Sequence, residues 1–174
     1  DMNCIHDAEM ILFAVPTAAI ESTAVKASAM IDHPVLIVNV AKGLHPVSHQ
    51  RLSEVLEQNI PAEKRRGIVS LIGPSHAEEV ILRLLTAINA VCKDESAAAE
   101  IQELFSNSYF RVYRNTDVIG AEYGVAVKNI MAIASGILEG IGQGDNARAA
   151  LMTRGLAEMA RFGCAMGGKS ETYI

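Results

Sequence analysis

The chain has 174 residues, of which half are hydrophobic and a fifth are charged. This length fits one domain or two small ones, and the composition is that of a globular protein with an aliphatic core. The net charge of -5 argues against a nucleic-acid partner, because no basic surplus is present to neutralise phosphates. The longest apolar run contains Pro16 and is too short to span a bilayer. We expect a cytoplasmic protein without membrane insertion.

The cysteines and histidines predict neither a disulfide framework nor a metal site. Three widely spaced cysteines without a CxxC pair fit reduced thiols in a cytosolic protein. Among five histidines, only His45 and His49 share an i, i+4 spacing, and Pro46 between them indicates a loop. We therefore expect no bound metal.

The first 115 residues alternate between short apolar runs and segments with helical spacing. The apolar runs predict strands at 11–15, 35–40, 68–72, 86–92 and 109–114. Helices are expected at 17–30, at 48–60 with Ser48 as N-cap, after 73 with Ser75 near the N-cap, and at 95–106. Strands joined by helical crossovers predict a parallel sheet, whose ligands bind where strands end. The expected ligand loops are therefore 15–17, 39–44 and 72–77.

From residue 116 onward the pattern becomes purely helical. Segments 116–140 and 147–168 carry apolar residues every three to four positions, and the glycine turn 140–144 separates them. These glycines are not a dinucleotide fingerprint, because they follow a helix and not a strand. We predict an α/β plus all-α protein: the C-terminal portion of a Rossmann-like parallel sheet in residues 1–115, then the start of a helical substrate domain in residues 116–174.

One lysine interrupts the apolar run of the first long helix. Lys128 shares a helix face with Gly124 and Ser135, and Gly120 with Gly124 forms a GxxxG spacing that lets another backbone approach. Two interpretations remain open. In one, Lys128 extends along the helix to solvent beside an exposed Asn129. In the other, it points into a cleft against the sheet, where a partly desolvated ammonium exchanges a proton with a substrate oxygen near neutral pH.

Five blocks occur in order along the chain: NVAKGL, IGPSHAEE, VYRNTDVIGAEYGVAVKNIMAIASGI, GDNARAALMTRGLAEMARFG and GGKSET. In this order and spacing they resemble the bacterial-type NAD(P)-dependent glycerol-3-phosphate dehydrogenases, over essentially the whole chain. The resemblance implies a dinucleotide-binding domain and a helical domain with the active site between them. It also implies reduction of dihydroxyacetone phosphate to sn-glycerol 3-phosphate by NADH or NADPH, and the reverse, within phospholipid biosynthesis.

The resemblance also implies roles for particular residues. Lys128 matches the catalytic lysine of the family and would be the general acid in reduction and the base in oxidation. Lys42, which alone could be an ordinary loop lysine, matches a second active-site lysine at cofactor and substrate. Ala77 matches a cofactor-binding position. Substrate-binding positions of the family correspond to Lys42, Gly73, Ser75, Lys128 and Asn129.

The sequence also departs from the family. It contains neither the βαβ unit with GxGxxG nor the Ser-Arg-Asn segment whose arginine grips the substrate phosphate, and residues 81–86 lack the usual Gly-Leu-Pro run. We therefore expect the chain to correspond to the middle of the enzyme, to bind dinucleotide poorly and to turn over little alone. An incomplete sheet would expose strand edges, so we expect a homo-oligomer.

Two other interpretations stay open on the sequence. The chain could belong to another two-domain dehydrogenase that acts on a different hydroxy compound. It could also be a non-catalytic oligomerising or nucleotide-sensing module that kept the core without the phosphate loop.

Overall fold

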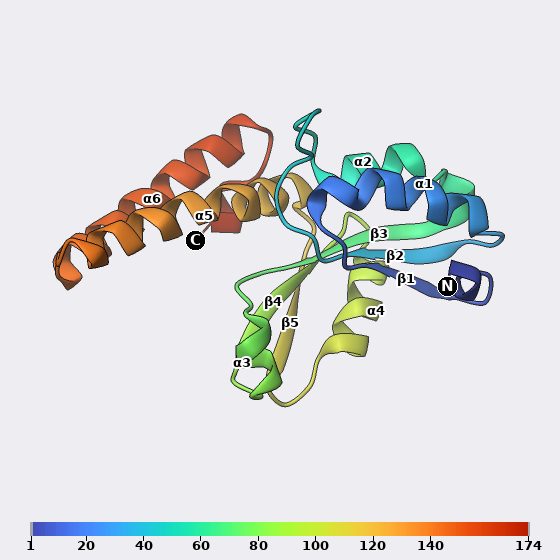
Figure 1. Cartoon of the computed structure of the whole chain (residues 1–174), viewed down its shortest axis with the longest axis horizontal. Coiled ribbons are helices and arrows are strands. Elements are labelled where there is room, and N and C mark those ends of the chain that lie inside the picture. The colour runs from blue at the N-terminus through green and yellow to red at the C-terminus, as the bar shows by residue number, and fades with distance from the viewer. Residues whose placement is uncertain (1, 174) are drawn as a thin grey trace.

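A computed structural model describes residues 2–173, which form a five-stranded sheet, its flanking helices and a long helical hairpin (Figure 1). The strands, hydrogen-bonded in chain order, are β1 (Met10–Phe13), β2 (Val35–Asn39), β3 (Arg65–Ile72), β4 (Thr86–Val91) and β5 (Phe110–Asn115). The helices are α1 (Ile20–Met30), α2 (Leu52–Asn59), α3 (Ala77–Ile81), α4 (Glu95–Phe105), α5 (Val118–Gly140) and α6 (Asp145–Ala165). Short 3-10 turns are η1 (Met2–Ile5), η2 (Thr17–Ala19), η3 (Ala62–Lys64) and η4 (Ser170–Tyr173).

The central strands are buried on both faces. Val35 and Ile37 of β2 pack with α1 and α2, whereas the alternate residues Leu36 and Val38 pack with α4. Figure 1 shows the same layers, with α1 and α2 on one side of the sheet and α4 on the other. Because successive strand residues point to opposite faces, a strand covered on both sides needs a continuous apolar run. The predicted α/β layer and the helical region after it are confirmed.

The prediction of a wholly parallel sheet was wrong at one pair of strands. Strands β1, β2 and β3 are parallel and β5 is parallel to β4, but β4 runs antiparallel to β3. The only helix between β3 and β4 is α3, whose five residues span about 8 Å. A parallel crossover must return along the whole of β3, which is eight residues or about 26 Å long. The short connection therefore reverses the direction of the chain at the carboxyl end of β3.

This reversal makes β4 and β5 project beyond the carboxyl end of β3. Ile72, the last residue of β3, pairs with Asn89, so β4 begins at Thr86 past the end of its neighbour. Figure 1 shows this extension with α3 at its tip, on the opposite side of the molecule from α1 and α2.

Ser48 is not the N-cap of α2 as predicted, whereas Ser75 lies near the N-cap of α3, directly before His76. An isolated bridge between Leu44 and Arg51 closes the preceding loop, so α2 begins only at Leu52. Ser48 lies within that loop and its hydroxyl bonds to Nδ1 of His45 at 3.0 Å. Helix α3 begins after His76 without a side-chain cap, which leaves Ser75 available for another contact.

Tyr173 fills the space between the two long helices. Its hydroxyl donates a hydrogen bond to the carbonyl oxygen of Gly120 in α5, 2.7 Å away. A Cβ added at Gly124 would lie 3.1 Å from the ring, and one added at Gly163 of α6 would lie 1.7 Å from the hydroxyl oxygen. The glycines thus leave room for an aromatic side chain. Burial raises the pKa of Tyr173 to about 12.

Asp117 joins the start of α5 to η4. Its carboxylate accepts hydrogen bonds from the Gly120 N–H (2.9 Å), the Lys169 N–H (2.8 Å) and the Thr172 hydroxyl (2.6 Å). Burial acts to raise the pKa of Asp117, but these hydrogen bonds outweigh it and lower the pKa. The carboxylate therefore caps α5 and fixes η4 beside it.

Replacing Gly163 with alanine should destabilise the hairpin, because the new methyl group would overlap the Tyr173 hydroxyl. We expect a loss of about 1–3 kcal/mol in the free energy of unfolding, measured by urea denaturation. Gly136→Ala in α5 is the matched control, since its Cβ would meet nothing within 4 Å. The control should be neutral or stabilising by up to about 1 kcal/mol. Equal effects of the two substitutions would contradict this packing.

Candidate functional site

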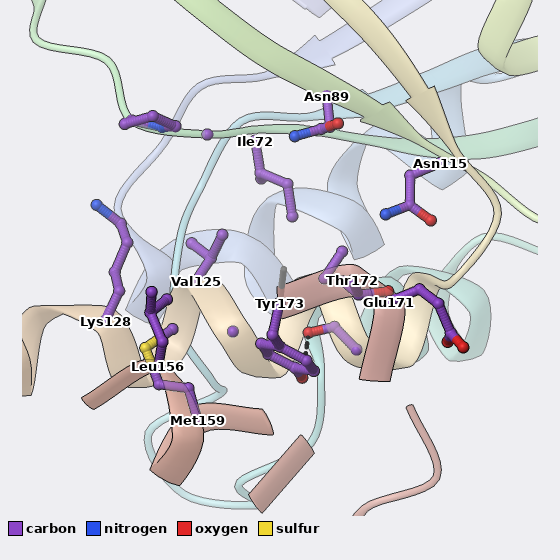
Figure 2. Close-up of a pocket in the computed structure, with 15 residues that line it drawn as sticks. Ile72, Asn89, Asn115, Val125, Lys128, Leu156, Met159, Glu171, Thr172 and Tyr173 are labelled. Carbon is purple, nitrogen blue, oxygen red and sulfur yellow. Dashed lines mark hydrogen bonds between the residues drawn. The ribbon is translucent and has the colours of Figure 1, made fainter. Parts of the chain in front are cut away.

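A cavity of about 500 Å³ lies between the carboxyl end of β3 and the α5–α6 hairpin. Its lining comes from the loop after β3, from β4 and β5, from both long helices and from η4. Figure 2 shows Asn89 and Asn115 on the sheet side, and Leu156, Met159 and Tyr173 on the opposite side. The sheet side of the cavity therefore carries two amide groups beside apolar residues, and the helical side combines apolar side chains with the charged groups of Lys128 and Glu171.

Lys128 lines this cavity, and its side chain is half-buried. Figure 2 shows the ammonium group extending away from Leu156 and Met159, toward the sheet side. Gly124, one helical turn earlier on the same face, also lines the cavity, because residues four apart share a face. Asn129 lies on the next face of α5, where it is exposed and outside the cavity lining. The structure therefore brings Lys128, but not Asn129, into this cavity.

Lys42 lies in the loop after β2 and bonds to the loop after β3. Its ammonium donates to the Ser75 hydroxyl across 3.5 Å, and its carbonyl oxygen accepts a bond of 2.8 Å from the Thr17 hydroxyl. Gly43 has a φ of +106°, a conformation that side chains rarely adopt and that favours glycine. The loops after β1, β2 and β3 therefore meet at one edge of the sheet, as predicted for the ligand loops.

The two lysines form a local concentration of positive charge. Burial lowers the pKa of Lys42, and the nearby positive charge of Lys128 lowers it further. Among residues 2–173, no carboxylate forms an ion pair with either lysine. Glu171 also lines the cavity, but two mutually repelling cations that form no ion pair in this part of the chain favour an anionic or strongly polarised ligand.

The other two predicted positions in the loop after β3 differ in their surroundings. Gly73 is buried and lines the cavity, and a Cβ added to it would lie 2.8 Å from the Cα of Ile88 in β4. Only glycine allows this close approach of two backbones. Ala77 is exposed at the first residue of α3 and is outside the cavity lining. The loop thus contributes Gly73 to the cavity and Ser75 to Lys42.

Sequence reasoning missed the amide groups of Asn89 and Asn115 on the sheet side of the cavity. Asn89 interrupts an otherwise apolar strand and Asn115 ends β5, and Figure 2 shows both side chains directed into the cavity. A polar residue inside an apolar strand was the available signal. Its direction depends on the antiparallel pairing of β4 with β3, which the sequence pattern did not reveal.

The described residues offer no candidate metal site. Within residues 2–173 no group of three or more His, Cys, Asp or Glu side chains could hold a metal ion. No disulfide joins the cysteines within residues 2–173, and Cys92 is buried. No helix in this part of the chain is both long and apolar enough to cross a membrane.

Comparison with known proteins identifies two matching family models. The N-terminal region of NAD-dependent glycerol-3-phosphate dehydrogenase matches residues 2–98, and the C-terminal region matches residues 117–174. A glycerol-3-phosphate dehydrogenase [NAD(P)+] of Streptococcus sanguinis is 51% identical over 169 residues, which are 97% of this chain and 50% of that protein. The chain thus spans about half the length of the curated relatives it matches.

Solved structures agree with the sequence matches. A glycerol-3-phosphate dehydrogenase from Coxiella burnetii is 38% identical with a TM-score of 0.84, over 94% of this chain and 49% of that one. The enzyme from Saccharomyces cerevisiae is 25% identical with a TM-score of 0.85, over 99% and 52% of the two chains. With both family regions matched in order around a site built on two lysines, the chain belongs to the NAD-dependent glycerol-3-phosphate dehydrogenase family of oxidoreductases.

Proposed function

We propose that the protein interconverts dihydroxyacetone phosphate and sn-glycerol 3-phosphate with NAD or NADP as cofactor. The observation that carries this proposal is the convergence beside the cavity of Lys42 and Lys128, two half-buried cations that form no ion pair with the carboxylates of residues 2–173. The proposed substrate is a ketone with a phosphate group, so it offers both a carbonyl oxygen to protonate and a negative charge to bind. Membership of the family supports the same reaction.

Lys128 is the proposed proton donor. When the ketone carbon accepts a hydride, negative charge develops on its oxygen, and an ammonium group directed at that oxygen stabilises the charge and then transfers the proton. In the reverse direction the neutral amine accepts the hydroxyl proton. Asn129, exposed beside Lys128, is a proposed substrate contact.

Lys42 and Ser75 are the proposed binding groups on the sheet side. The Ser75 hydroxyl lies 3.5 Å from the Lys42 ammonium, a long contact that directs the ammonium toward the loop after β3 and leaves it free to hold a substrate oxygen or phosphate. Gly73 is a proposed substrate contact through its backbone, since it lines the cavity and has no side chain to block the approach.

The loops at the sheet edge fit the reactive half of a dinucleotide. The carboxyl ends of β1, β2 and β3 lie side by side, and a Cβ added at Gly43 would meet nothing within 4 Å, so the loop backbone is open to a ligand. Lys42 and Ala77 are the proposed cofactor contacts. The bound dinucleotide supplies the hydride. Residues 1–115 would thus position the cofactor, and residues 116–174 would supply the proton.

We also propose that the protein is a cytoplasmic homo-oligomer. Edge strand β1 pairs only with β2 among the described residues, and the side chains of Ile130, Ile133 and Ile137 on α5 are 58–65% exposed. Unpaired edges and apolar patches are surfaces that a second copy can cover. The lack of a disulfide among the cysteines of the described residues supports a reducing compartment. Sedimentation that shows only monomer would contradict the oligomer.

Lys42 should titrate below an ordinary lysine, because burial and the charge of Lys128 lower its pKa. Acylation by a succinimidyl ester at a series of pH values, read by peptide mass spectrometry, should show Lys42 becoming reactive at lower pH than exposed Lys26. Lys128→Met removes the neighbouring charge and should move the Lys42 profile to higher pH, without making it equal to that of Lys26 because burial remains. An identical Lys42 profile in the two proteins would contradict the cation pair.

Lys128→Ala should abolish most activity of the full-length protein with dihydroxyacetone phosphate. We expect kcat to fall by about 10²–10⁴-fold, the usual contribution of a positioned acid or base. Lys26→Ala, at an exposed lysine of α1, is the control and should leave kcat unchanged. The pH dependence of the remaining rate should also change, because the group that exchanges the proton is gone. Retained activity with an unchanged pH profile would refute the role of Lys128.

A further inference from the structure

Glu122 places a carboxylate from α5 inside the sheet domain. The residue is 6% exposed, and donors surround both of its carboxylate oxygens. Oε1 accepts from the Ser53 N–H (3.2 Å) and the Ser70 hydroxyl (2.8 Å), while Oε2 accepts from the Ser53 hydroxyl (2.5 Å) and Nη1 of Arg51 (3.2 Å). Arg51 is itself held by Glu54 at 2.6 Å. Glu122 therefore joins α5 to the start of α2 and to β3.

This arrangement is a poor source of stability. Burial raises the pKa of Glu122, and the hydrogen bonds from Ser53 and Ser70 and the charge of Arg51 only partly offset that rise. A carboxyl group whose pKa is higher in the folded state than in the unfolded state loses stabilising effect as pH rises through the folded-state pKa. Apolar side chains of similar volume often replace buried ion pairs without loss of stability. The contacts of Glu122 thus call for another explanation.

The position of Glu122 relative to the candidate site provides an explanation for its contacts. Lys128 lies six positions after Glu122, which is about 9 Å along a helix. Val125 lies between them and lines the cavity together with Ile72. Ser70 precedes Ile72 and Gly73 on β3. One carboxylate therefore holds both the helix that carries Lys128 and the strand that leads into the substrate loop.

We propose that Glu122 is a positioning residue that sets the rotation and axial position of α5, and thereby the distance of the Lys128 ammonium from the loop after β3. The inference rests on the proposed role of Lys128 as proton donor. Glu122 is outside the lining of the main cavity and forms no hydrogen bond with Lys42, although both residues border a small neighbouring pocket, so its route to Lys128 is through the helix. A displacement of about 1 Å at a reacting group can reduce a rate by about 100-fold.

The test uses Glu122→Gln in the full-length protein. Glutamine keeps the size of the side chain, but its NH2 group cannot accept the hydrogen bonds that Oε2 receives. We expect kcat with dihydroxyacetone phosphate to fall about 10- to 100-fold. Ser70→Ala removes one donor only and should shift kcat in the same direction by a smaller factor. It also keeps the test informative if Glu122→Gln fails to fold.

A double-mutant cycle separates positioning from a general structural effect. If Glu122 acts through Lys128, then adding Glu122→Gln to Lys128→Ala should slow the residual reaction no further, because the group being positioned is absent. Additive losses would overturn the inference. Ile101→Ala, a substitution in the core beneath α4, is the control for lost stability and should lower the unfolding midpoint without lowering kcat at a temperature where the variant is folded.

The outcomes also separate this inference from the proposed function. Full activity of Lys128→Ala would refute the proposed function and leave nothing for Glu122 to position. Loss of activity in Lys128→Ala together with unchanged kcat in Glu122→Gln and Ser70→Ala would overturn only the positioning role.

Discussion

Two buried carboxylates at the start of α5 fix the candidate site in place. Asp117 binds the first turn of the helix and η4, and one turn later Glu122 enters the sheet domain and binds Ser53 and Ser70. A buried carboxylate is expensive to leave without partners, so each one tolerates few alternative positions. Helix α5 is therefore held at two points on its circumference, and its rotation determines which face, and hence which side chain, borders the cavity.

The reversal of the chain after β3 creates the sheet side of that cavity. Because β4 runs antiparallel to β3, Asn89 lies opposite Ile72 at the end of β3, and Figure 2 shows its side chain and that of Asn115 directed into the cavity. Gly73 permits the reversal, since any side chain there would collide with the backbone of β4 at Ile88. Gly73 therefore affects both the direction of β4 and the shape of the cavity.

The cation pair gives the site its electrostatic character. Lys42 comes from a loop of the sheet domain and Lys128 from a helix of the hairpin, so the two charges meet only because both parts of the chain pack together. Their mutual repulsion is tolerated because Asp117 and Glu122 hold the supporting backbone through separate contacts. Like charges held near each other, with no ion pair to either among the described residues, favour the binding of negative charge.

The local sequence determined the elements, the two-layer core around the central strands and the loops that carry Lys42, Gly73 and Ser75, because apolar periodicity and strand ends are local properties. Resemblance to a family placed Lys128 at the catalytic position. Only the tertiary structure decided the direction of β4, the late start of α2, the exposure of Asn129 and Ala77, and the burial of Glu122 among donors from α2 and β3. Each of these depends on contacts between residues far apart in the chain, such as the 52 positions between Ser70 and Glu122, for which a one-dimensional pattern carries no distance information.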